Sequence, residues 1–228
     1  MRLLIVNPNT SPGVTARIGA AAQAVARPGD AFRTVPAAHG PRLIVDAADA
    51  ALAEKGVLDA VAAHAAGVDG IVLASFGDTG AIALRRLYPR IAILGIAEAA
   101  FDDARRIGGT FAIVSFAPEV APPLRMMAER YGMGGALAAM RTLPGPLVHD
   151  PADVADALRA PILDLCLSCV SDGVDSIVLG GGPLAGLAGD LASECPIPLI
   201  DGTQAAISRM REVLESSRSG ASLSARQE

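Results

Sequence analysis

Apolar residues along the chain gather into short runs that alternate with longer segments of helical spacing. Short apolar runs bounded by glycine, proline or polar residues are typical of strands buried on both faces of a parallel sheet. The predicted strands are RLLIV (2–6), GIVLA (70–74), IAILG (91–95), FAIVS (111–115), SIVLG (176–180) and PLI (198–200). Ala-rich segments between them, including 57–67 and 154–173, have helical spacing. Strands that alternate with helices predict βαβ units and therefore an α/β fold.

The chain also contains two similar halves. The segment GVDGIVLASFGDTG (67–80) aligns with GVDSIVLGGGPLAG (173–186) at an offset of 106 residues, and seven of the fourteen positions are identical. Three further pairs align at offsets of 106, 108 and 110: EAAF with QAAI, RLLIVN with TFAIVS, and AAHGP with LVHDP. This self-similarity predicts two pseudo-symmetric flavodoxin-like lobes, each with a roughly four-stranded parallel sheet and with the active-site cleft between them.

The two halves also set the expected domain boundaries. The first lobe comprises residues 1–97 and 205–228, because the final helix, over about 204–215, is expected to pack back on it. The second lobe comprises residues 98–204. After residue 215 the sequence is polar and rich in Ser and Arg, which predicts a frayed tail.

Composition narrows the class of partner. The 228 residues have a formal net charge of −5 and only 3% aromatic residues, which argues against a nucleic-acid or anionic-membrane partner. No apolar stretch approaches the roughly 18 residues needed to span a bilayer, and MRLLIVNPNTS resembles a first strand rather than a secretory signal. We therefore expect a cytoplasmic protein that acts on a small molecule, has no nucleic-acid or membrane partner, and forms a homo-oligomer.

Cysteine usage points to structural thiols. The chain has three cysteines, Cys166, Cys169 and Cys195, and an odd number suits a reducing compartment better than a disulfide framework. Cys166 and Cys169 have C-x-x-C spacing but lie within a helical pattern, with no second pair or nearby histidine to complete a zinc site. We expect buried thiols and no metal.

Polar and glycine residues follow the predicted strands where the cleft should lie. NPNTS (7–11) and ASFGDTG (74–80) follow strands of the first half, while Ser115 and GGGP (180–183) hold equivalent places in the second. Thr10 or Ser11 should also cap a helix that begins near residue 13. Amides, hydroxyls and free backbone N–H groups suit a carboxylate or ring carbonyl. The candidate substrate-binding residues are Asn7, Asn9, Thr10, Asp78, Thr79, Ser115, Gly181 and Gly182.

The candidate catalytic residues are Ser75, His39 and His149. Ser75 has three interpretations, as a helix cap, a ligand-binding hydroxyl or a nucleophile, and Leu73 stands where a G-x-S-x-G elbow requires its first glycine. His39 and His149 occupy equivalent places in the two halves, and either could be a general base or a locally bonded loop histidine. The GGGP loop does not satisfy G-x-G-x-x-G, so we expect no nucleotide or other cofactor.

Four motifs together resemble a known family. NPNTS (7–11), FGDTG (76–80), ILGIAEAAF (93–101) and LGGGPLAGLA (179–188) resemble, in order and spacing, the landmarks of the Asp/Glu/hydantoin racemase superfamily, in its hydantoin- and allantoin-racemase branch. The resemblance covers roughly residues 1–210 and implies the same two-lobed fold. It also implies a two-thiol mechanism, in which one thiolate removes the α-proton of the substrate and an opposite thiol donates a proton to the other face.

This chain departs from that pattern at both thiol positions. The resemblance places Ser75 and Gly181 where the two cysteines are expected, and related decarboxylases retain the second of them. A serine hydroxyl is a much weaker acid than a thiol, and glycine has no side chain. We therefore predict a cofactor-independent enzyme that acts on a small carboxylate, amino-acid derivative or cyclic ureide by lyase, decarboxylase-like or hydrolytic chemistry. An inactive small-molecule-binding paralogue, or a racemase with other acid and base groups, stays an alternative.

Overall fold

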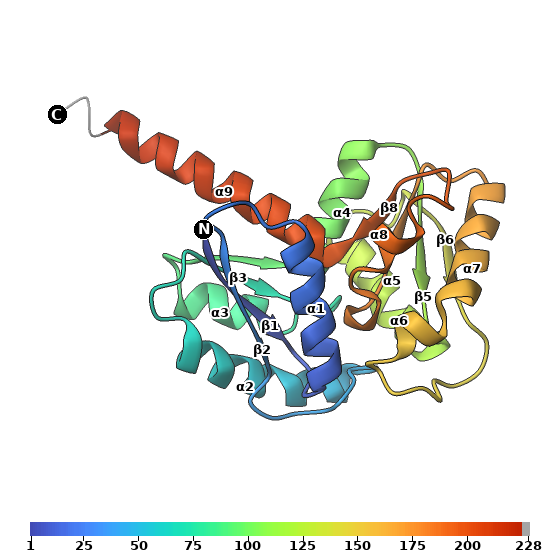
Figure 1. Cartoon of the computed structure of the whole chain (residues 1–228), viewed down its shortest axis with the longest axis horizontal. Helices are drawn as coiled ribbons and strands as arrows, with labels where there is room; N and C mark the ends of the chain where they lie inside the picture. Colours follow the sequence, from blue (N-terminus) through green and yellow to red (C-terminus); the bar gives the residue numbers. More distant parts are fainter. Residues whose placement is uncertain (225–228) are drawn as a thin grey trace.

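The computed structural model describes residues 1–224 and, within them, two four-stranded parallel sheets (Figure 1). The strands are β1 (Arg2–Asn7), β2 (Ala31–Pro36), β3 (Gly70–Leu73), β4 (Ala92–Gly95), β5 (Phe111–Ser115), β6 (Leu137–Thr142), β7 (Ser176–Leu179) and β8 (Leu199–Asp201). The first sheet has the order β2-β1-β3-β4 and the second the order β6-β5-β7-β8, so both halves share one topology. The predicted α/β fold with two similar parallel lobes is confirmed.

The apolar pattern did not predict two of the strands, β2 and β6. Each lies at the edge of its sheet and is only partly buried. Their sequences, AFRTVP and LAAMRT, mix apolar and polar residues, because an edge strand has less apolar contact and tolerates arginine and proline. The six predicted strands are the inner strands and the short edge strands β4 and β8.

The helices of the described chain are α1 (Pro12–Ala24), α2 (Ala47–His64), α3 (Ala81–Leu87), α4 (Ile96–Ile107), α5 (Ala121–Arg130), α6 (Val154–Ala157), α7 (Arg159–Ser171), α8 (Leu187–Leu191) and α9 (Gly202–Ser224), with 3-10 turns η1 (Pro118–Val120) and η2 (Gly182–Leu184). Ser11, not Thr10, caps α1, since its Oγ accepts a hydrogen bond from the Val14 amide. The single helix predicted over 154–173 is instead α6 and α7. Pro161 explains the break, because its ring would clash with the carbonyl of Ala157 in a continuous helix.

Two helices, α4 and α9, cross between the lobes in opposite directions. α4 follows β4 of the first sheet and packs against β7 and β8 of the second, whereas α9 follows β8 and packs against α1, β3 and β4. The two helices also pack against each other where the lobes meet (Figure 1). Phe101 of α4 is fully buried there, with ring centroids 6.3 Å from Phe76 and 5.9 Å from Phe111. The exchange of helices joins the lobes through a hydrophobic cluster that contains residues of both.

The carboxyl-terminal helix is longer than the sequence predicted. A frayed tail was expected after residue 215, but α9 continues through Ser224 and extends beyond the body of the molecule (Figure 1). The Ser217 hydroxyl donates a hydrogen bond of 2.9 Å to the Val213 carbonyl, which adds a side-chain contact to α9 past residue 215. The rest of the predicted tail, residues 225–228, lies outside the described residues.

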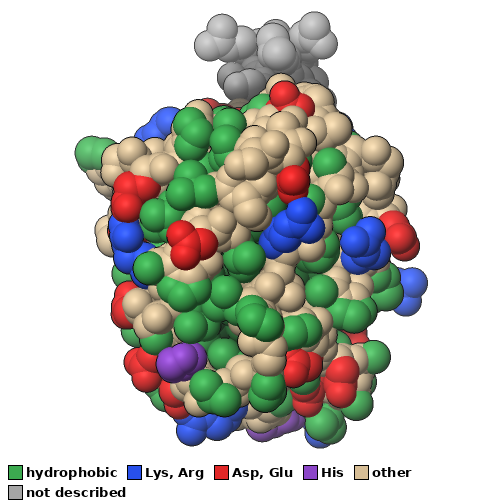
Figure 2. Space-filling model, turned by 90° about the vertical axis from the view of Figure 1, so that its right-hand side faces the viewer, with side chains coloured by type: hydrophobic (Ala, Val, Ile, Leu, Met, Phe, Trp, Pro, Cys, Tyr) green, Lys and Arg blue, Asp and Glu red, His purple; other side chains and the backbone are tan. Residues whose placement is uncertain are grey.

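The three cysteines are buried, as predicted, and none is in a disulfide. Burial raises the pKa of the Cys166 thiol to about 12 and also raises that of Cys169, which opposes thiolate chemistry at these positions. In residues 1–224 no helix is long and apolar enough to cross a membrane. On the second-lobe face in Figure 2, basic and acidic side chains are interspersed rather than separated by sign.

Candidate active site

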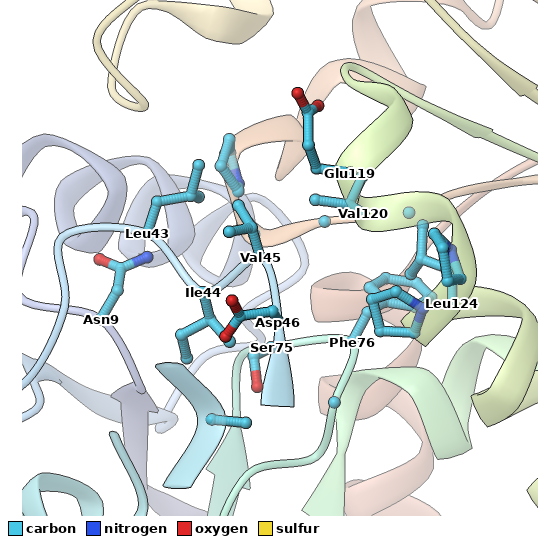
Figure 3. Close-up of a pocket in the computed structure, with 18 of the residues that line it drawn as sticks. Asn9, Leu43, Ile44, Val45, Asp46, Ser75, Phe76, Glu119, Val120 and Leu124 are labelled. Atoms are coloured by element: carbon cyan, nitrogen blue, oxygen red, sulfur yellow. The ribbon is translucent and has the colours of Figure 1, made fainter. Parts of the chain in front are cut away.

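A cavity of about 540 Å³ lies between the lobes, at the carboxyl ends of strands from both sheets (Figure 3). This volume is in the range of small-molecule sites. The first lobe contributes Asn9, residues 43–47 before and at the start of α2, and residues 74–77 after β3. The second lobe contributes Phe116, much of the segment 119–126, and residues 180–183 after β7. The loops predicted to face each other across the cleft therefore meet at one cavity.

Asn9 presents a hydrogen-bond donor to this cavity. Its Oδ1 accepts hydrogen bonds from Asn7 Nδ2 at 2.8 Å and from the Ser11 amide at 2.9 Å. Because both acceptor contacts use Oδ1, the amide group is fixed with Nδ2 as its free end. In Figure 3 this nitrogen points toward Val45 and the cavity, and it donates no hydrogen bond within the described residues. Asn7, which is buried beneath it, also donates to Thr15 Oγ1 at 2.9 Å and thus supports the orientation.

Ser75 lines the first-lobe wall of the cavity and is only partly buried. Its Oγ lies 3.2 Å from Thr79 Oγ1 and 3.5 Å from the Thr79 amide nitrogen. Neither contact supplies a base, so the Ser75 hydroxyl has no group here that would take its proton. The arrangement is that of a ligand-binding or capping hydroxyl, and Thr79 supports it from below.

Gly181 and Gly182 form the opposite wall. Gly181 has φ +132°, and a Cβ atom at this position would lie 2.7 Å from Phe116 Cε1. A Cβ at Gly182 would lie 3.1 Å from the Ala74 carbonyl oxygen, so the two site loops are nearly in contact. Ser115 donates from Oγ to the Gly180 carbonyl at 2.6 Å and fixes the start of this loop. Glycine at 181 and 182 therefore permits a close approach of backbone to backbone and to any ligand.

Apolar side chains form most of the remaining cavity surface. Leu43, Ile44 and Val45 lie on the first-lobe side, and Val120 and Leu124 face them from the second lobe (Figure 3). Two prolines and Met126 of α5 continue the second-lobe wall. The cavity thus has a polar end, near Asn9 and Ser75, and an extensive apolar surface suited to a hydrocarbon substituent.

Comparison with known proteins places this architecture in one family. A family model described as Asp/Glu/Hydantoin racemase matches residues 3–210. A hydantoin racemase from Paenarthrobacter aurescens is 33% identical over 209 residues, which cover 90% of this chain and 88% of that protein. The chain belongs to the Asp/Glu/hydantoin racemase family.

Solved structures agree with this assignment. An allantoin racemase from Klebsiella pneumoniae superposes on this member of the family with a TM-score of 0.87 and 35% identity, covering 95% of this chain and 89% of that chain. An allantoin racemase from Pseudomonas fluorescens gives a TM-score of 0.86 at 26% identity, covering 95% and 92%. An arylmalonate decarboxylase, 17% identical with a TM-score of 0.65, shares the fold. The chain is a hydantoin- and allantoin-racemase-like member of the racemase family.

No cysteine or histidine lines the cavity of this racemase-family member among residues 1–224. The cysteines lie in α7 and before β8, buried away from it. His39 is on the surface, where its Nε2 lies 3.0 Å from Asp59 Oδ2, and His149 is exposed. The structure thus brings Ser75 and Gly181 together but does not bring either predicted histidine to them.

Carboxylates stand at the margin of the cavity, and sequence reasoning did not select them. Asp46 and Glu119 both line it and are exposed. Asp46 caps α2 by accepting the Asp49 amide hydrogen bond at 2.8 Å, whereas Glu119 of η1 has no hydrogen-bond or ion-pair partner within the described residues. In Figure 3 Glu119 lies across the opening from Ser75. A signal was present in the repeat, since the 108-residue offset pairs NPNTS (7–11) with SFAPE (115–119), which ends at Glu119.

The predicted substrate-binding residues fall into two groups. Asn9, Gly181 and Gly182 line the cavity together with Ser75. The others hold the loops from behind, as described above for Asn7, Thr79 and Ser115. Thr10 Oγ1 donates to the Pro41 carbonyl at 3.3 Å, which fixes the loop before α2. Asp78 is buried, and its carboxylate points away from the cavity toward α4.

Proposed function

We propose that this protein binds a small cyclic ureide or carboxylate with an apolar substituent and, where the ligand carries a carboxylate on its α-carbon, removes it as CO2 through an enolate-type intermediate rather than by two-thiol racemisation. The observation that supports this most is that Ser75 on one wall faces Gly181 on the other, with no thiol or imidazole among the lining residues. The names of its relatives, hydantoin racemase and allantoin racemase, support a ureide or a related small molecule as the ligand.

Hydrogen-bond donors at the polar end suit a developing negative charge. Asn9 Nδ2 and the Ser75 hydroxyl are available from the first lobe. The amides of Gly181 and Gly182 donate no hydrogen bond within the described chain, and they are available from the second lobe. Donors held in place before the reaction stabilise an enolate or carboxylate strongly where apolar walls exclude water. The apolar surface around Val45 and Leu124 would hold the substituent.

The geometry favours decarboxylation over racemisation and over hydrolysis. Racemisation by proton exchange requires an acid and a base on opposite faces of the α-carbon, whereas Gly181 has no side chain and the carboxylates Asp46 and Glu119 stand at the exposed margin of the cavity. Decarboxylation requires less. The carbon–carboxylate bond breaks, CO2 leaves, the electron pair passes to the α-carbon and its neighbouring carbonyl, and one proton from water or a hydroxyl replaces the lost group. Hydrolysis by Ser75 would need a base beside its hydroxyl, and within the described part of the chain its hydrogen-bond partner is Thr79, which is not a base.

A second candidate function, a binding protein without turnover, is favoured by the same lack of a thiol or imidazole among the lining residues. The retained donors and apolar walls would serve a ligand sensor equally well. The two candidates differ in whether a bound ligand is consumed.

Proton NMR in D2O separates the candidates. The protein would be incubated with 5-substituted hydantoins, allantoin, amino acids and substituted malonates. Loss of a substrate with appearance of a cleaved product supports the proposal. Saturable binding without any product supports the binding protein. Deuterium at the α-position of a recovered chiral substrate, at a rate above the protein-free control, would contradict the proposal in favour of a racemase with other acid and base groups.

Two serine variants then test the polar end. Ser75→Ala removes the cavity hydroxyl and should weaken binding and turnover. Ser176→Ala is the matched control, because Ser176 is buried at the opposite end of β7 and its Oγ has no hydrogen-bond partner among residues 1–224. Equal activity of Ser75→Ala and Ser176→Ala would show that Ser75 takes no part in the site.

A further inference from the structure

A buried carboxylate joins three segments beside the cavity. Asp78, in the loop that contains Ser75, accepts hydrogen bonds from the amides of Ala97 and Glu98 at 3.1 and 3.2 Å, at the start of α4. It also accepts a hydrogen bond of 2.6 Å from the Tyr131 hydroxyl, which follows α5 in the second lobe. The side chain is therefore fixed from both lobes.

The local backbone is built around this carboxylate. Asp78 is the one non-glycine residue of the described chain with positive φ, at 45°. A Cβ atom on Gly95 would lie 1.9 Å from the Asp78 carboxyl carbon, so glycine at the end of β4 makes room for the carboxylate. A strained residue whose side chain is held by several donors is a pattern found at functional sites.

The second lobe contains a natural comparison. Asp201, at the end of β8, is the repeat counterpart of Gly95, and its carboxylate accepts from the amides of Gln204 at 3.0 Å and Gly186 at 2.5 Å. Both lobes thus place a buried carboxylate at the start of a crossing helix. The carboxylate comes from the strand end in the second lobe and from the site loop in the first. Asp78 alone of the two accepts a side-chain donor from the opposite lobe.

Each end of the Asp78–Tyr131 hydrogen bond lies on a segment that also contributes a wall of the cavity. Ser75 lies three residues before Asp78, and the Asp78 amide donates to the Ser75 carbonyl at 3.0 Å. Tyr131 follows the last residue of α5, the helix whose Leu124 and Met126 line the opposite side. The Tyr131 ring also packs on Phe101, with a centroid separation of 6.1 Å.

We propose that the Asp78–Tyr131 hydrogen bond is a positioning contact that fixes the Ser75 wall of the cavity relative to the α5 wall. Helix capping alone does not require it, as Asp201 demonstrates. Fixing two walls before a ligand arrives lowers the ordering cost of binding, and so favours a ligand that contacts both. The expected effect on ligand affinity rests on the proposed function, whereas the expected effect on the position of the Ser75 wall does not.

The charge state of Asp78 enters this contact. Burial raises its pKa to about 6, although the hydrogen bonds from Tyr131 and the two amides favour the ionised form. The charged groups around it are Glu98 of α4, Arg85 of α3, which pairs with Glu98, and Arg130 and Glu54 on the far side of the loop. Removal of the Tyr131 hydroxyl would withdraw a donor to the carboxylate and raise its pKa further.

The structural arm uses a fluorine label on the Ser75 wall. A Ser75→Cys protein is alkylated with 3-bromo-1,1,1-trifluoroacetone, and unmodified protein, whose thiols are buried, serves as the labelling control. The 19F shift should titrate with a midpoint near pH 6, and Tyr131→Phe should move the midpoint upward and broaden or shift the signal. Tyr88→Phe, the change at the other tyrosine, and Asp201→Asn should leave both unchanged. A midpoint and line shape unaffected by Tyr131→Phe would overturn the proposal.

The ligand arm measures the dissociation constant for 5-benzylhydantoin by calorimetry. Tyr131→Phe should weaken binding by about fivefold or more, whereas Tyr88→Phe should not change it. Unchanged affinity together with an unchanged fluorine signal refutes the positioning role. If the unmodified protein binds no hydantoin, the proposed ligand class is wrong, and the fluorine titration still decides the positioning role on its own.

Discussion

A single methyl group at position 181 tests why the second-lobe wall is made of glycine. In Gly181→Ala the residue would keep φ near +132°, a conformation that L side chains rarely adopt, at a cost of about 1–3 kcal/mol. The new Cβ would also lie 2.7 Å from Phe116 Cε1, and such overpacking costs about 1–3 kcal/mol more. We therefore expect the free energy of unfolding to fall by about 2–6 kcal/mol.

Urea denaturation followed by circular dichroism measures this loss. Gly189→Ala is the control, because no atom lies within 4 Å of its added Cβ and the position is helical, so this change should be neutral or stabilise by up to about 1 kcal/mol. Adding Phe116→Leu to Gly181→Ala should recover part of the loss, since the two residues are in contact. A Gly181→Ala protein within about 0.5 kcal/mol of the unmodified protein would refute this reasoning. The same strain opposes a simple Gly181→Cys restoration of a second thiol.

Three further predictions concern separate groups. Because the folded pKa of Asp78 is raised from 3.8 to about 6, its contribution to stability is greatest below about pH 4 and is lost as the pH rises to 6. In urea titrations the unmodified protein should therefore lose up to about 3 kcal/mol relative to Asp78→Asn between pH 4 and 6. A pH-independent difference between the two proteins would contradict this. Asn9→Ala should weaken 5-benzylhydantoin binding by calorimetry by about 1 kcal/mol, and unchanged affinity would remove Asn9 from the site. Dithionitrobenzoate should react with no thiol of the native protein and with three after unfolding, so rapid native reaction would contradict burial of Cys166, Cys169 and Cys195.

The sequence was most informative where burial is complete. Inner strands such as β3 and β7 are continuous apolar runs, and their repetition predicted two lobes of equal topology. Edge strands β2 and β6 have fewer apolar contacts, so their mixed pattern did not reveal them. Pro161 could have indicated the break between α6 and α7, because proline excludes a continuous helix at that point.

The site was predictable in its loops but not in its contacts. Asn9, Ser75, Gly181 and Gly182 follow strands, so the topology alone brings them to one edge. Whether a polar residue points into the cavity depends on tertiary partners, and the sequence could not show that Asp78 faces Tyr131 instead. The apolar walls come from a loop and from α5, whose positions no short motif encodes.

The most direct test of the central claim follows one enantiomer of 5-benzylhydantoin and, in the same D2O solution, phenylmalonate by proton NMR. The account predicts that the α-proton of the hydantoin exchanges no faster than in the protein-free control, because Gly181 has no side chain and the carboxylates that line the cavity, Asp46 and Glu119, stand at its exposed margin. It also predicts that phenylmalonate is lost with formation of α-deuterated phenylacetate. Protein-dependent deuterium exchange at the hydantoin α-carbon, with loss of optical purity and no cleavage of phenylmalonate, would contradict it.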